Sequence, residues 1–232
     1  MTAKDSPSQS VLIFHGIGTP GRTLEHGEAQ YWLSRDQFCA ILDRIAAMGT
    51  DAPLITFDDG NASDCEIALP ELQRRELHAV FFLLTARLDQ PGSLASQQVR
   101  DLAQAGQTIG LHGHAHRDWR RLEAQDRLQE YHLARQQLSD LAGHEVNLAA
   151  APFGFYDRQV IKDLREQGFA AVYTSDWGRA GAGFIRPRNC IDNRMSARTI
   201  SDALTGHIPL ARRPRRLLGL ARKRLLPMWG RS

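Results

Sequence analysis

Short apolar runs alternate with segments of helical periodicity along this chain. The first run, VLIF at 11–14, is followed by residues 36–48, where apolar side chains recur on one helix face. The run AVFFLL at 79–84 has no polar alternation, which is typical of a strand covered on both faces. The same patterns predict strands at 54–57, 107–111, 148–154 and 170–175, and helices at 66–75, 97–105, 120–141 and 158–167.

Repeated strand–helix units predict a parallel sheet, either a (β/α) barrel or a doubly wound sheet. In both architectures, functional side chains gather at the carboxyl ends of the strands. Polar residues of this chain fall at those positions, among them His15, Asp58, Asp59, His112 and Asp176. No internal repeat or low-complexity linker interrupts the pattern. We therefore expect one domain over 11–210, a polar lead at 1–10 and a tail at 211–232.

The composition is that of a soluble globular protein. The chain has 232 residues, of which 42% are hydrophobic and 24% charged. Its three cysteines have no CxxC spacing, which argues against a disulfide framework or a thiolate zinc site and fits a reducing compartment. The polar amino terminus lacks an apolar segment of signal-peptide length, and no run approaches a membrane span, so we expect a cytoplasmic protein.

The net charge of +3 conceals a basic tail. Residues 212–231 hold eight Lys or Arg and no acid, which leaves 21 basic and 26 acidic residues in the rest of the chain. The tail mixes these cations with leucines, Met228 and Trp229 at near-helical spacing, which suits a helix on an anionic membrane surface. A solvated tail is the alternative. We expect no nucleic-acid partner, because leucines gain nothing against phosphate.

Two adjacent carboxylates, Asp58 and Asp59, end the strand-like run LITF. Side by side they repel each other unless a cation or a shared proton relieves the repulsion. An Asp-Asp-Gly sequence by itself is more often an ordinary turn than a site. Here Gly60 would let the backbone turn tightly beside the two side chains.

A histidine cluster, HGHAH, follows another strand-like run. His112 and His116 are four residues apart and can grip one metal ion, although such a pair alone is also common in solvated loops. Two imidazoles and one carboxylate together form a facial ligand set that leaves positions open for water and substrate. We therefore predict that Asp59, His112 and His116 bind a divalent metal, while Asp58 accepts a proton from the attacking water.

In their order along the chain, these motifs resemble those of the polysaccharide deacetylase family, carbohydrate esterase family four, or NodB-homology domain. TFDDG resembles its first motif, HGHAH its histidine motif, and PFGFYD its third motif. The opening VLIFHGIG is similar to the family's first strand, and other similar segments lie at 66–85, 166–178 and 185–189. The resemblance covers roughly residues 10–190.

The resemblance implies a distorted parallel (β/α) barrel that hydrolyses the N-acetyl group of an amino sugar in a polysaccharide, oligosaccharide or lipid-linked glycan. It implies Asp58 as general base and Asp59, His112 and His116 as ligands, with zinc the most common metal and cobalt or nickel in some members. The predicted substrate-binding residues are Pro152, Phe153, Gly154, Tyr156, Trp177 and Arg188. For Tyr156 and Trp177, core packing is the alternative to stacking on a sugar.

Three departures from the family pattern stand out. Gly113 replaces the Ser or Thr after the first histidine, and Ala150 replaces the Arg that begins the third motif. Arg186 or Arg188 is the candidate to supply that missing charge. The family's Leu-x-His general acid has no clear match, and the candidates are His207, His15 and His114.

These departures keep two alternatives open beside an N-deacetylase of envelope or exopolysaccharide synthesis. One is hydrolysis of another amide, such as a formamido sugar or a cyclic ureide. The other is a glycan-binding pseudoenzyme that releases no acetate. The sequence does not indicate the oligomeric state.

Overall fold

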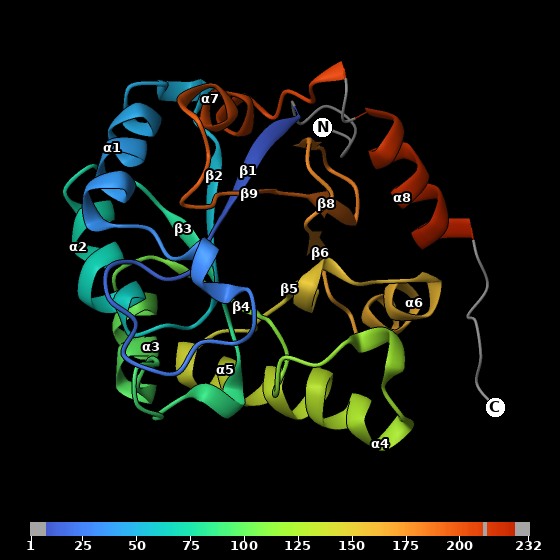
Figure 1. Cartoon of the computed structure of the whole chain (residues 1–232). Coiled ribbons are helices and arrows are strands. Elements are labelled where there is room, and N and C mark those ends of the chain that lie inside the picture. Colours follow the sequence, from blue (N-terminus) through green and yellow to red (C-terminus); the bar gives the residue numbers. More distant parts are fainter. Residues whose placement is uncertain (1–7, 211–212, 226–232) are drawn as a thin grey trace.

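Parallel strands form the centre of the computed structural model, which describes residues 8–210 and 213–225 (Figure 1). The strands are β1 Gln9–Phe14, β2 Leu54–Asp59, β3 Ala79–Leu83, β4 Thr108–Leu111, β5 Leu148–Ala150, β6 Ala171–Thr174, β7 Arg179–Ala180, β8 Ile185–Pro187 and β9 Asn189–Cys190. The helices are α1 Arg35–Ala46, α2 Leu69–Gln73, α3 Ser96–Gln104, α4 Ala124–Arg127, α5 Ala134–Ala142, α6 Arg158–Glu166, α7 Ala197–Thr205 and α8 Arg213–Leu225.

The strands of the described chain curl into a nearly closed barrel. Their order is β7-β1-β2-β3-β4-β5-β6-β8, and β9 pairs with β1. Only one residue, Arg188, separates β8 from β9. Because β8 pairs in parallel with β6 and β9 pairs in parallel with β1, this junction brings the two edges of the sheet together. The predicted distorted parallel (β/α) barrel is confirmed, and the doubly wound alternative is wrong.

Side chains of the strands alternate between two apolar layers. Phe14, Phe57 and Phe81 face the helices with Phe38 of α1, and the Phe57 and Phe81 rings stack at 4.7 Å. Their neighbours in sequence point into the barrel, where Phe82 lies 5.1 Å from Tyr173 between ring centroids. The barrel interior thus contains aromatic walls, and the polar residues of the site lie above them.

Helix boundaries follow from local capping. Ser34 and Gln37 form a capping box at the start of α1, and Asp157 caps α6 by accepting from the amide of Val160. The helix predicted at 120–141 begins later, at Ala124, because Asp118 caps a separate 3-10 turn and accepts from the amide of Arg120. A π-helical segment, Leu128–Leu133, then joins α4 to α5.

Helix α8 packs beside α6 at the rim (Figure 1). Residues 1–7, 211–212 and 226–232, which include Met228 and Trp229 of the predicted membrane-binding tail, lie outside the described residues. Among the described helices, none combines the length and the apolar character that crossing a bilayer requires.

Candidate metal centre and catalytic site

Three predicted ligands converge at the carboxyl ends of β2 and β4. Asp59 is the last residue of β2, while His112 and His116 belong to the loop that follows β4. Asp59 Oδ1 lies 3.6 Å from His112 Nε2 and 3.7 Å from His116 Nε2. One ligand atom from each residue falls within 4.8 Å of the others, which is the grouping a metal ion needs.

The donor set fits a divalent cation. Asp59 Oδ1 is buried without a hydrogen-bond partner in the described structure. Burial raises the pKa of Asp59, but the neighbouring His116, His15, His112 and Arg87 outweigh this effect and lower it, so the carboxylate is ionised. Burial lowers the pKa of His112 to about 4, which keeps its imidazole neutral and able to coordinate. A charged oxygen with two imidazole nitrogens matches the ligands of zinc-type ions.

Each histidine is oriented through its other ring nitrogen. His112 Nδ1 lies 2.8 Å from the carbonyl oxygen of Ala150, and His116 Nδ1 lies 3.0 Å from Glu25 Oε2. Arg87 pairs with Glu25 and places a second nitrogen 3.7 Å from Asp59 Oδ2. These contacts point both Nε2 atoms toward Asp59, in the manner of outer residues that orient metal ligands. Sequence reasoning missed Glu25 and Arg87, because they come from other segments of the chain.

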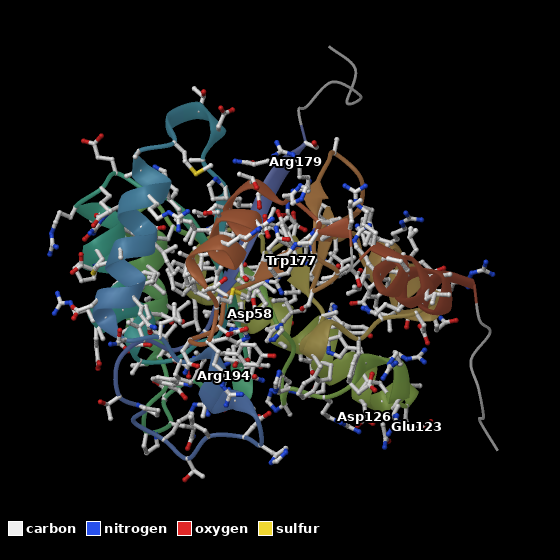
Figure 2. The ribbon with its side chains drawn as sticks, turned by 45° about the horizontal axis from the view of Figure 1, so that its top comes forward. Asp58, Glu123, Asp126, Trp177, Arg179 and Arg194 are labelled. Carbon is white, nitrogen blue, oxygen red and sulfur yellow. The ribbon has the colours of Figure 1, made fainter. Side chains whose placement is uncertain are left out.

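Asp58, the predicted base, lies near the centre of the molecule in the barrel interior (Figure 2). The guanidinium of Arg188 holds both its oxygens, at 2.6 and 2.7 Å, and also donates to the hydroxyl of Thr56 at 3.0 Å. Burial raises the pKa of Asp58, but the charge of Arg188 and its hydrogen bonds to the carboxylate more than compensate and lower it. The carboxylate is therefore fixed in its ionised form, 3.9 Å from His112 Nε2.

The structure corrects the prediction for Arg188. Its side chain has no exposed surface, and its bidentate contact with Asp58 occupies it fully, so it does not reach substrate. Instead its guanidinium lies against Asp58, which supports Arg188 as the candidate for the charge missing at Ala150. The barrel closure between β8 and β9 carries it inward, whereas Arg186 donates to the hydroxyl of Tyr173 at 2.8 Å.

The loop that holds both histidines is fixed by Glu130, a buried residue of the π-helical segment. Its carboxylate accepts from the amides of His114 and Ala115 at 2.8 and 3.0 Å. Gly113 has a φ of 102°, and a Cβ there would clash with Glu130 Oε2. Glu130 thus holds the loop at His114 and Ala115 through two backbone amides. Sequence reasoning missed it, because an acid in a charged helix looks like a solvated residue.

Of the three histidines considered as proton donors, His15 lies beside the carboxylates. Its proximity lowers the pKa of both Asp58 and Asp59, its ring stacks on Tyr31 at 4.9 Å, and its Nδ1 is buried without a hydrogen-bond partner among the described residues. His114 contacts the hydroxyl of Thr85 at 2.8 Å. His207 lies after α7 and lines a different hollow, so the structure does not place it at the site.

Aromatic side chains form one wall of the site. Phe153 is 50% exposed, and its ring lies 4.1 Å from that of His116. Phe155 is also exposed, at 5.7 Å from Phe153, and was not predicted. Tyr156 is only 1% exposed and donates to Asp176, so the prediction that it stacks on a sugar is wrong. The alternation of side chains along this turn puts the two phenylalanines outward.

Other predicted substrate residues have structural roles in part. Pro152 and Gly154 are buried and shape the turn that presents Phe153. Trp177 is half-buried, packs against the core and donates through Nε1 to the carbonyl oxygen of His207 at 3.0 Å. These contacts favour core packing, the alternative considered for Trp177, over stacking on a sugar.

The backbone is strained where the site is assembled. Among the described residues, six non-glycine residues have positive φ, and four of them follow or end central strands: Asp59, His116, Phe153 and Trp177. Such conformations cost about 1–3 kcal/mol each and persist where the surrounding structure fixes them. Two of the four are proposed metal ligands, so the fold spends stability on their placement.

A further carboxyl group, Asp64, is fully buried in the π-helical segment Asp64–Ala68. Burial and the charge of nearby Asp59 raise its pKa well above the ordinary value, which favours the protonated form. Neither oxygen has a hydrogen-bond partner among the described residues. A neutral Asp64 adds no third negative charge beside Asp58 and Asp59.

The carboxyl-terminal helix α8 contacts the turn that carries Phe153. Lys223 donates to the carbonyl oxygen of Gly154 at 3.0 Å and to Asp176 Oδ1 at 2.6 Å, and it lies 5.0 Å from the centre of the Tyr156 ring. Asp176 Oδ2 in turn accepts from Tyr156 at 2.6 Å. This contact, the α8 latch, joins the end of the chain to the rim of the site.

Comparisons with known proteins agree with this geometry. A family model for polysaccharide deacetylase matches residues 47–172. The candidate polysaccharide deacetylase YxkH of Bacillus subtilis (strain 168) is 21% identical over 183 residues, covering 73% of this chain and 65% of YxkH. YheN of the same organism, of the same description, is 29% identical over 148 residues, covering 60% and 50%. This chain thus matches about half to two thirds of the length of these relatives.

Solved structures share the fold. The deacetylase PplD of Streptococcus pyogenes, in complex with acetate, superimposes with a TM-score of 0.75 at 17% identity, covering 85% of this chain and 98% of PplD. IcaB from Ammonifex degensii superimposes with a TM-score of 0.68 at 21% identity, covering 89% and 100%. Because the family model spans more than half of the chain and the barrel is that of its members, the protein belongs to the polysaccharide deacetylase family.

Proposed function

We propose that this deacetylase is a divalent-metal-dependent hydrolase that removes the N-acetyl group from an amino sugar in a glycan. The main observation in support is that the two adjacent carboxylates have different surroundings. Asp59 presents an unpartnered buried oxygen to two imidazoles, while Asp58 is held apart by Arg188. That arrangement supports one aspartate as a ligand and the other as a base.

Asp59, His112 and His116 would hold the metal, which we propose is zinc, with cobalt or nickel as alternatives. The bound ion would supply Lewis acidity toward the amide carbonyl and lower the pKa of water. Asp58 takes the proton of the attacking water, because its carboxylate is ionised and fixed by Arg188.

The remaining steps fall to residues around the carboxylates. His15 is the proposed donor of the proton to the departing amine, since it lies beside both carboxylates. The backbone amide of Phe153 is the proposed donor to the developing oxyanion. The exposed rings of Phe153 and Phe155 offer a stacking surface for a sugar.

The proposed substrate is an N-acetylated glycan, either free or lipid-linked, and the proposed location is the cytoplasmic face of a membrane. The excess of eight cations over no acids in residues 212–231 supports this location.

Acetate release from a panel of N-acetylated oligosaccharides tests the proposal. The metal-stripped protein should release no acetate, and added zinc, cobalt or nickel should restore release. Asp58→Asn should keep about one metal per chain and lose at least about 100-fold in turnover. Asp51→Asn, which changes an exposed aspartate, is the matched control and should match the wild type.

Other outcomes would identify the alternatives. Release of formate from a formamido sugar, with no acetate, would point to another amide. Tight glycan binding without any release would indicate a binding protein. Full turnover in Asp58→Asn would remove that aspartate from the role of base.

A further inference from the structure

A second hollow lies away from the metal centre, between α7, α8 and β7. It has a volume of about 640 Å³ and is lined by Arg179, Thr205, Gly206, His207, Ile208, Arg213, Arg216 and Leu217. Figure 2 shows Arg179 at the edge of the molecule, apart from Asp58 near its centre. The lining contains three arginines and a histidine but no acidic side chain, so this hollow favours an anion.

The three arginines are held in place without losing their charge to a carboxylate. Arg179 donates to the carbonyl oxygen of Thr205 at 2.8 Å, and Arg213 donates to that of Ile208 at 3.1 Å. Arg216 donates to the carbonyl oxygens of Asp176 and Trp177 at 2.9 and 2.7 Å. Among the described residues, none of the three forms an ion pair. Backbone carbonyls thus fix the guanidinium groups around the hollow and leave a net positive charge there.

Exposed leucines lie on α8 and just before it, and one of them, Leu217, lines the hollow. Leu217 and Leu218 on α8 are 62% and 72% exposed, and Leu210, just before α8, is 74% exposed. Elsewhere in the described chain, the exposed large apolar residues are Leu128, Leu133 and the two phenylalanines of the site. A helix that projects leucines beside arginines has the composition of an interfacial helix.

We propose that this hollow and the leucines beside it form a docking site for an anionic membrane, with a lipid phosphate group held among Arg179, Arg213 and Arg216. A bilayer supplies both required chemistries at once: phosphate oxygens for the guanidinium groups and an acyl boundary for the leucines. A free phosphate would meet only the first. The inference rests on the proposed membrane location and does not depend on the deacetylase reaction.

Docking on α8 would also place the metal centre relative to the membrane. The first turn of α8 borders the hollow, and Lys223 near its end reaches the turn that carries Phe153. Thirteen helical residues span about 20 Å. The mouth of the site would then open beside the lipid surface, where a lipid-linked glycan is within reach.

Co-sedimentation of the full chain with vesicles tests the site. The wild type should bind phosphatidylglycerol-containing vesicles and not pure phosphatidylcholine vesicles, and binding should weaken with salt. Each cation near an anionic surface contributes about fivefold, so R179Q/R213Q should weaken binding by about 25-fold. L217S/L218S, which changes only exposed side chains, should weaken binding comparably and covers the case in which the arginine variant fails to fold.

The matched control is R100Q/L128S, which removes an exposed arginine and an exposed leucine that belong neither to α8 nor to the lining of the hollow and should bind like the wild type. Wild-type binding that neither test variant reduces would overturn the site and leave the membrane location standing. No binding to any vesicle would overturn both. Two results together would assign the hollow to a free phosphate and overturn the lipid proposal. Millimolar inorganic phosphate would displace the wild type from vesicles, and L217S/L218S would bind vesicles as well as the wild type. Acetate release from a soluble glycan reports the deacetylase proposal separately.

Discussion

Replacing Arg188 by Met would remove the guanidinium from the barrel interior and leave Asp58 buried without its bidentate partner. Loss of one member of a buried ion pair costs about 3–5 kcal/mol. In a chain of this size, that loss corresponds to a fall in Tm of roughly 6–20 °C. Protonation of Asp58 would relieve part of this cost, so we expect the lower half of that range at neutral pH.

The same substitution should change the pH dependence of the reaction. An opposite charge in contact lowers the pKa of an aspartate by about 1–3 units. The acid limb of kcat/KM should therefore move upward by about 1–3 pH units in Arg188→Met, because the base protonates more easily. In the wild type, the lowered folded-state pKa of Asp58 stabilises the fold above the ordinary aspartate pKa, and this stabilisation is lost as the pH falls through the lowered value. The Tm difference between the two proteins should narrow in acid.

Acetate release across pH and thermal unfolding would measure both effects. Arg186→Met is the matched control, because Arg186 lies on β8 two residues away and contacts Tyr173 rather than a carboxylate. The double variant R188M/D58N should recover part of the stability, since it leaves no unpaired charge. A wild-type acid limb and Tm in Arg188→Met would refute the assignment of Arg188 as the partner of the base.

Further predictions concern the loops around the metal. Gly113→Ala should lower the free energy of unfolding by about 1–3 kcal/mol through strain at positive φ, and the clash with Glu130 should add to this loss. Gly143→Ala is the control, because it has the same strain and no clash. Equal losses for the two variants in urea denaturation would contradict the clash. Glu25→Gln should weaken zinc binding by about 10–100-fold by calorimetry, while Glu145→Gln on the surface should not change it. Zinc at 100 times its Kd should stabilise the stripped protein by about 2.7 kcal/mol, and an unchanged Tm would argue against a resident metal.

The strand ends were predictable because they depend on local patterns. Apolar runs stop at Asp58 and His112, and parallel strands bring such ends to one edge, so the grouping of Asp59 with His112 and His116 followed from spacing and topology. The fold class was predictable for the same reason. What the sequence pattern could not resolve was the interior of helical stretches, where π-helical segments replace regular α-helix.

The residues that compensate for the departures were beyond sequence reasoning. Glu130 belongs to a helix rich in charge, and nothing in its neighbours distinguishes a buried acid from a solvated one. Arg188 was singled out, but its role depends on the closure of the barrel between β8 and β9, which turns it inward. Long-range geometry also decides the exposure of Phe155 and the burial of Tyr156, one residue apart.

The α8 latch has a consequence for how the protein is handled at the bench. A shortened protein ending before α8 would lose Lys223 together with the other cations from Arg213 onward, and the turn bearing Phe153 would lose a support. Reduced activity of such a fragment could then come either from loss of the Lys223 contacts at the proposed site or from loss of membrane binding. Fusion tags are better attached at the opposite terminus, and single substitutions on the outer side of α8 separate the two effects where truncation cannot.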